Sequence, residues 1–139
     1  MIDNNCAYCV EGDLVAKFGI KICELETSKV YLFKEQSHPG RCIVAHKKHV
    51  GDMNELTAEE RAAYFEDVAR VARAIMKAFN PDKVNYGAYG DTGHHLHFHL
   101  CPKYKDEYEW GGVFLMNPDK KYLTDEEYAD MIEKIKANL

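Results

Sequence analysis

The stretch Gly93-His94-His95-Leu96-His97-Phe98-His99-Leu100-Cys101-Pro102 carries the strongest signal in this sequence of 139 residues. Its histidines and apolar residues alternate, which is the pattern of a β-strand with two different faces. On such a strand His95, His97 and His99 share one face, and the apolar residues between them pack against a helix on the other. Packing alone would favour threonine or valine at these positions. The row of three imidazoles therefore indicates a functional site on an open face of a sheet.

Two kinds of chemistry are open to such a row. The first is a three-histidine zinc site. One zinc ion cannot bind all three rings, because alternate strand residues lie about 6.6 Å apart and Zn–N bonds are about 2.0–2.1 Å long. The other chemistry is nucleophilic catalysis, in which an unprotonated imidazole attacks a phosphorus or acyl centre while neighbouring imidazoles bind charge or transfer protons. The row favours this second chemistry, with a substrate that lies along the strand.

The rest of the sequence predicts an α+β fold around this strand. Three strands are expected within residues 20–25, 30–33 and 42–45, and two more within residues 84–102, the second being the histidine strand. Apolar residues recur at three- and four-residue steps from Thr57 to Asn80, which predicts one long helix. A second helix is expected from Thr124. Five antiparallel strands with segregated helices follow from this order.

Composition bounds the class of protein. Hydrophobic residues make up 46% of the chain, and no linker divides it, so we expect one domain over residues 1–139. The net charge of -5 argues against non-specific nucleic-acid binding, which needs a basic surface. The first residues show no cationic and apolar leader, and no apolar run approaches the ~18 residues of a membrane span. We therefore expect a soluble, cytoplasmic protein without a membrane or nucleic-acid partner.

The histidine strand resembles the histidine triad (HIT) motif, in which histidines alternate with apolar residues. Gly90-Asp91-Thr92 resembles the small polar run that precedes that motif, and residues 39–49, PGRCIVAHKKH, resemble the family's turn, apolar strand and lysine-rich tail. The resemblance covers most of residues 6–104 and leaves 105–139 as a C-terminal extension with a helix. It implies a HIT-like fold, with a five-stranded antiparallel sheet, one long helix and a C-terminal helix, and a homodimer.

The resemblance also implies a nucleotidyl hydrolase or transferase that cleaves a bond at the α-phosphate of a nucleotide. The catalytic residues would be His97, His99 and His95. His97 would attack phosphorus and form a nucleotidyl-histidine intermediate, and His99 would bind phosphate oxygens or donate to the leaving group. The substrate would be a nucleoside phosphoramidate or a dinucleoside polyphosphate with a purine mononucleotide moiety, and no organic cofactor is expected. By position in the family pattern, the substrate-binding residues would include Asn85, Asp91 and Thr92.

Two positions depart from the family pattern. Arg41 stands where many members carry a fourth histidine, and it would be a surface cation, a support for the His97 strand or a ligand of a phosphate. The loop of residues 34–37 is shorter than in the family, so Lys34 or Glu35 would replace the acidic residue that holds the ribose hydroxyls. We expect no catalytic role for His94.

Cys6 and Cys9 have the spacing of half a tetrahedral metal site. The resemblance implies that His49 and His95 complete such a site in some members, with one structural Zn²⁺ per chain. The alternatives are two free thiols or a redox pair, and the redox reading is disfavoured because no helix is expected behind Cys6.

Two other functions stay open from the sequence. The chain could be a nucleotide- or partner-binding module that keeps the triad with negligible turnover, which Arg41 and the altered ribose loop would favour. It could also handle metal through its cysteines and histidines.

Overall fold

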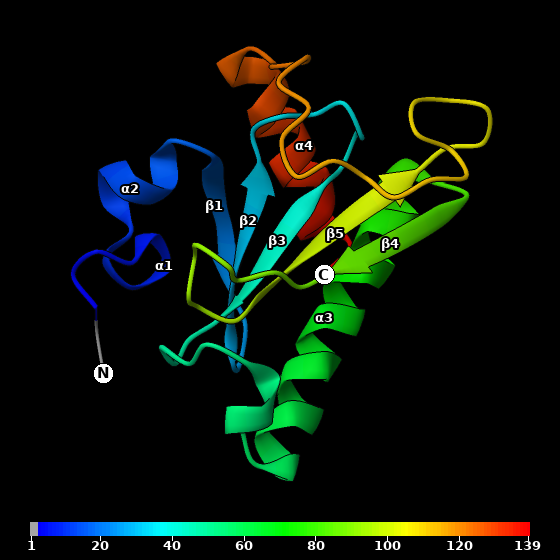
Figure 1. Ribbon diagram of the computed structural model, residues 1–139. Coiled ribbons are helices and arrows are strands. Elements are labelled where there is room, and N and C mark those ends of the chain that lie inside the picture. The colour runs from blue at the N-terminus through cyan, green and yellow to red at the C-terminus, as the bar shows by residue number, and fades with distance from the viewer. Residues whose placement is uncertain (1–2) are drawn as a thin grey trace.

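The computed structural model describes residues 3–139, and in them one antiparallel sheet has five strands in the order β1-β2-β3-β5-β4. This confirms the α+β class and the five-stranded sheet, and Figure 1 shows the strands side by side in this order, with β5 between β3 and β4. The strands are β1 (Gly19–Glu24), β2 (Ser28–Phe33), β3 (Cys42–His46), β4 (Lys83–Gly87) and β5 (His97–Lys103).

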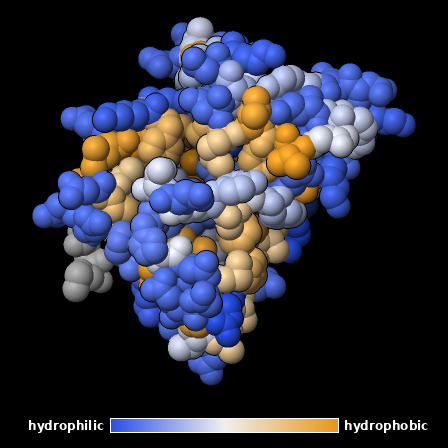
Figure 2. Space-filling view, in the orientation of Figure 1, coloured by the Kyte–Doolittle hydropathy of each residue, from blue (hydrophilic) through white to orange (hydrophobic). Residues whose placement is uncertain are grey.

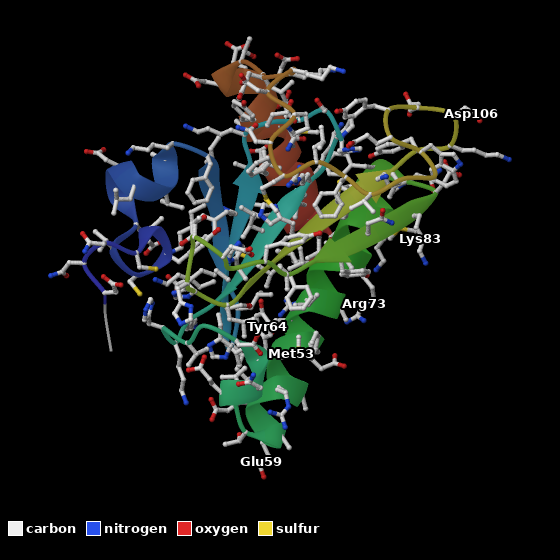
Figure 3. All side chains as sticks on the ribbon, viewed as in Figure 1. Met53, Glu59, Tyr64, Arg73, Lys83 and Asp106 are labelled. Atoms are coloured by element: carbon white, nitrogen blue, oxygen red, sulfur yellow. The ribbon has the colours of Figure 1, made fainter. Side chains whose placement is uncertain are left out.

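The long helix α3 (Ala58–Phe79) covers one face of the sheet, as its apolar periodicity predicts. Its N-cap Thr57 accepts a hydrogen bond from a first-turn N–H through its hydroxyl, and it ends at Asn80, whose left-handed backbone stops the helical ladder. Tyr64, labelled in Figure 3, donates a buried hydrogen bond from α3 to the carbonyl of Val44 at 2.7 Å. This bond ties the helix to the middle of the sheet.

The second predicted helix, α4 (Asp125–Ala137), begins at Thr124 with a complete capping box to Glu127. It packs beside α3 and the β1 edge and buries Tyr128 and Ile135 in the same core. The strands therefore have two unlike faces. Val30, Leu32, Val44, Phe98 and Leu100 point to the helices, and Tyr31, Phe33, Ile43, Ala45, His97 and His99 belong to the opposite face.

Two short helices that the sequence does not predict cover part of that opposite face. They are α1 (Ala7–Val10) and α2 (Gly12–Ala16), and they bury Tyr8 and Val15 against the sheet. Figure 1 shows them beside the β1 edge. The expectation that no helix lies behind Cys6 was wrong, because Cys6 is the N-cap of α1. Helices of four or five residues are too short to show a period and depend on tertiary packing.

The C-terminal extension is irregular between β5 and α4, apart from turns, and buried charged side chains hold it to the sheet. Lys103 is almost fully buried and donates to two backbone carbonyls of the loop 104–112. Glu35 accepts from the N–H groups of Lys120 at 2.8 Å and Lys121 at 2.9 Å. Figure 1 shows the extension crossing in front of the sheet before it reaches α4. No helix within residues 3–139 is long and apolar enough to span a bilayer.

Candidate active site

A pocket of about 960 Å³ lies on the sheet face opposite α3. Its floor is the histidine side of β5 with Ile43 of β3. Its walls are α1 with Tyr8, the β4–β5 loop, and residues 113–117 of the extension. Figure 2 looks at this side of the molecule and shows apolar residues gathered over its upper part with polar residues around them. Three segments far apart in the sequence therefore enclose one space over the histidines.

The three histidines of the motif are buried in this pocket. His95, His97 and His99 are 2%, 8% and 3% exposed, so the expectation of an open face was wrong. The N-terminal helices and the extension, which have no clear periodicity, close that face. The ring of Tyr8 packs 5.0 Å from the ring of His97, centroid to centroid. β5 begins at His97, so His95 lies in the loop before the strand.

The backbone fixes which nitrogen of His97 carries its proton. Nδ1 lies 2.6 Å from the carbonyl oxygen of His95, and because that oxygen can only accept, Nδ1–H donates. Burial lowers the pKa of His97, which keeps the ring neutral near pH 7. Its Nε2 forms no hydrogen bond within residues 3–139, is not sealed from solvent, and belongs to a ring that lines the pocket. This nitrogen has the properties of a nucleophile.

His99 shares the pocket with His97 but has a different environment. The two rings lie 5.5 Å apart, and Arg41 places Nη2 3.0 Å and Nε 3.3 Å from His99 Nδ1. Burial, the nearby charge of Arg41 and then His97 lower the pKa of His99 to about 2. His99 is therefore neutral throughout the physiological pH range.

A cluster of possible metal ligands lies beside the histidine strand, and its ligand atoms all lie within 4.8 Å of one another. Its members are Cys6, Cys9, His49 and His95. Sγ of Cys6 is 3.3 Å from His95 Nδ1, Sγ of Cys9 is 3.3 Å from His49 Nδ1, and the two Nδ1 atoms are 3.2 Å apart. A tetrahedral ion with bonds of about 2.0–2.3 Å separates its ligand atoms by about 3.3–3.8 Å. The donor set and its spacing fit zinc.

The ring of His95 is oriented for this role. Its Nε2 lies 2.6 Å from the carbonyl oxygen of His46 and donates to it, which leaves the lone pair on Nδ1, the nitrogen that faces the thiols. Burial lowers the pKa of His95 to about 4, so the ring is neutral and able to bind a metal near pH 7. His95 therefore belongs to the Cys/His cluster, while the backbone carbonyl of the same residue orients His97.

The HIT domain family matches residues 19–106, the segment that runs from β1 through the histidine strand. The chain belongs to the HIT domain family. It is 30% identical over 122 residues to Protein hit of Bacillus subtilis, covering 83% of this chain and 82% of that protein. It is 29% identical over 116 residues to the adenosine 5'-monophosphoramidase hnt1 of Schizosaccharomyces pombe, covering 77% of this chain and 80% of that protein.

Solved HIT structures share the fold. A histidine triad protein of Sinorhizobium meliloti superposes with a TM-score of 0.84 at 23% identity and covers 92% of this chain and 95% of its own. A Zn-bound histidine triad family protein of Mycobacterium smegmatis superposes with a TM-score of 0.68 at 22% identity, covering 95% and 93% of the two chains. These comparisons confirm the HIT-like fold that the histidine motif implies.

The structure brings part of the sequence-predicted HIT substrate site together. Asp91 and Thr92 line the pocket from the β4–β5 loop, both exposed. Asn85 lies in β4 opposite Cys101 and does not line the pocket. Arg41 is fully buried and is not a surface cation; it reaches His99 from outside the pocket lining.

Glu35 is not brought to the pocket either. Although burial raises the pKa of this carboxyl, it accepts hydrogen bonds from the backbone and hydroxyl of Ser37 and from the backbone of the extension, and these bonds lower the pKa below its usual value. His94, for which no role is expected, lines the pocket beside Gly51, where an added Cβ would lie 2.1 Å from its ring.

Sequence reasoning missed two walls of the pocket. Tyr8 lies between Cys6 and Cys9, so a metal site that includes His95 would have placed it near the histidine strand. Its residue type and its neighbours in the sequence do not by themselves indicate the contact with His97. The apolar run of residues 113–116 follows two glycines in an otherwise polar extension and forms the pocket's outer wall. That run was a usable signal, because four consecutive apolar residues in a segment rich in charged residues indicate an apolar surface, and in the structure three of these side chains are exposed.

Proposed function

We propose that this HIT-family protein is a nucleotidyl hydrolase or transferase whose nucleophile is His97. The observation that carries the proposal is the free, neutral Nε2 of His97 at the floor of a pocket large enough for a nucleotide. Nε2 would attack the α-phosphorus and form an N–P bond as the bond to the leaving group breaks, and the leaving group would keep the bonding electron pair and take a proton from water. A second water would then attack phosphorus and give up a proton to solvent as the N–P bond breaks, which releases the nucleoside monophosphate and restores the neutral imidazole.

The charge of the pocket favours a phosphoramidate over a dinucleoside polyphosphate. Among the described residues no Lys or Arg lines the pocket, whereas Asp3 and Asp91 bring two carboxylates to it. A polyphosphate carries several negative charges and would need cations along its length. A nucleoside phosphoramidate carries one phosphoryl group and a neutral or cationic leaving group. Phe18, Phe33 and Phe114 supply apolar surface suited to a purine base.

We propose one structural Zn²⁺ per chain, bound by Cys6, Cys9, His49 and His95. Four protein ligands leave no open position on the metal, so the ion would take no part in the reaction. When bound it would fix α1, and with α1 the ring of Tyr8 against His97. The donor spacing and the orientation of His95 support this proposal.

We further propose that the chain acts as one cytoplasmic domain and as a homodimer. The extension supplies a wall of the pocket, which supports a single domain over residues 1–139. The support for the dimer is the exposed edge of the sheet, where β4 is the last strand. Tyr86 of β4 is exposed there and lines a shallow groove together with Met76 and Arg73 of α3. Figure 3 labels Arg73. An exposed edge with apolar side chains favours pairing with a second copy.

The test is steady-state hydrolysis of adenosine 5'-phosphoramidate and of diadenosine triphosphate by the zinc-loaded full chain. We expect release of AMP, faster from the phosphoramidate, and its loss in His97→Ala. Arg70→Ala is the control, since Arg70 is exposed on α3 and does not line the pocket. Tight nucleotide binding without any release would favour the binding module instead.

A further inference from the structure

Arg41 is a buried cation without an acidic partner. It directly precedes β3, its side chain is fully buried, and it forms no ion pair with a carboxylate within residues 3–139. Its guanidinium lies against the faces of Phe33 and Phe114, at 4.2 and 4.8 Å from the ring centroids. A buried charge is costly unless its donors are satisfied and its field is used. The partners of these donors therefore indicate what Arg41 does.

The donors of Arg41 join the pocket wall to the triad. Nη1 donates to the carbonyl of Leu115 at 3.0 Å, and Nη2 donates to the carbonyl of Met116 at 2.9 Å. Both residues belong to the outer wall of the pocket. Nε and Nη2 also converge on Nδ1 of His99. One side chain thus sets the position of the wall and of the His99 ring together.

These contacts decide the tautomer of His99. A guanidinium has five N–H donors and no acceptor, so Nδ1 of His99 must present its lone pair to Arg41. The neutral ring then carries its hydrogen on Nε2. A proton on Nδ1 would direct one N–H at two others about 3 Å away, next to a fixed positive charge. Of the two ring nitrogens, only Nε2 remains for the pocket.

We propose that Arg41 is a positioning residue that holds His99 in its Nε2–H tautomer, so that this N–H is a hydrogen-bond donor that binds the phosphoryl oxygens of the substrate. This inference rests on the function proposed above. It removes the alternative in which His99 passes a proton to the leaving group, since the ring has no second proton to give.

The charge of Arg41 strengthens this donor. A cation hydrogen-bonded to Nδ1 draws electron density from the ring and polarises Nε2–H toward an anion, because hydrogen bonds in a buried chain reinforce one another. The effect is opposite to that of a carboxylate on a histidine, which makes the ring a better base. The rings of His97 and His99 are neighbours on one strand face, so a phosphoryl group attacked by His97 has its oxygens beside His99.

The first test is the protonation state of His99 in the zinc-loaded full chain with ¹⁵N-labelled histidine. Long-range ¹H–¹⁵N spectra should show the Nε2–H tautomer at all pH values between about 5 and 8, without titration. In Arg41→Met the ring should populate both tautomers, because no donor then faces Nδ1. Arg41→Lys keeps a charge and a donor group, so it should keep the Nε2–H tautomer, and it serves as the second variant if Arg41→Met fails to fold. Arg70→Met is the control, because Arg70 is exposed on α3.

The second test is kinetic. With adenosine 5'-phosphoramidate, kcat of Arg41→Met should fall about 100-fold, the usual effect of losing one charge-stabilising donor, while KM changes by less than about threefold. A proton on Nδ1, titration of wild-type His99 in that pH range, or wild-type kcat in Arg41→Met would overturn the inference. If the wild type releases no nucleotide, the proposed function fails, and the ring spectra alone then support or overturn the tautomer of His99.

Discussion

Replacing His99 with glutamine should make the protein less sensitive to acid. The folded-state pKa of His99 is lowered to about 2, whereas a histidine in the unfolded chain titrates near 6.5. Below about pH 6.5 the unfolded chain binds a proton that the folded protein does not, so stability is lost as the pH falls toward the folded pKa. From about pH 8 to about pH 5 this one group costs about 2 kcal/mol of unfolding free energy. Glutamine keeps an acceptor for Arg41 and a donor for the pocket but does not titrate.

The assay is urea unfolding followed by circular dichroism at about pH 8, 6.5 and 5 for wild type, His99→Gln and His94→Gln. Between the highest and lowest pH, His99→Gln should lose about 2 kcal/mol less than wild type. Other buried histidines and the metal site are common to both proteins and cancel in this difference. His94→Gln should follow the wild type, because His94 is exposed. An equal loss in wild type and His99→Gln would refute the reasoning.

Three further predictions concern the core, the metal and the substrate. Tyr64→Phe should lower the unfolding free energy by about 1–3 kcal/mol, measured by urea unfolding, because the carbonyl of Val44 loses a buried donor; an unchanged midpoint would contradict the tie between α3 and the sheet. Elemental analysis should find about one zinc per wild-type chain and almost none in Cys9→Ser, since a structural site needs its four protein ligands. Cys23→Ser is the control and should keep the metal. A metal-free, fully folded wild type would contradict the site. In Asp91→Lys, the ratio of kcat/KM for diadenosine triphosphate to kcat/KM for adenosine 5'-phosphoramidate should rise at least about tenfold, because a cation replaces a pocket carboxylate. An unchanged ratio would show that the charge of the pocket does not select the substrate.

Much of the fold follows from local patterns in the sequence. The alternation in residues 95–100 predicts a strand with two unlike faces, and the structure has Phe98 and Leu100 on the helix side with His97 and His99 opposite. The period and the caps predict both α3 and α4, because those features depend on residues close in the chain.

The closure of the site could not be predicted in the same way. Tyr8 reaches His97, and Leu115 reaches Arg41, across the sheet, so these contacts depend on tertiary packing and leave no periodic trace. The same is true of Glu35. As an acidic residue in the right loop it matched a substrate ligand, yet its oxygens bind the extension's backbone. Residue type and position in the sequence identified the candidate site residues. Only the three-dimensional structure shows which groups each of them contacts.

The central claim is that His97 is the attacking group. The most direct measurement is intact-mass analysis of the zinc-loaded chain, quenched in acetone seconds after mixing with adenosine 5'-phosphoramidate, for wild type, His99→Ala and His97→Gly. We expect a mass increase of one adenylyl group in the wild type or in the slower His99→Ala, located on His97 by peptide mapping and absent from His97→Gly. An adduct of the same mass that persists in His97→Gly would contradict the account.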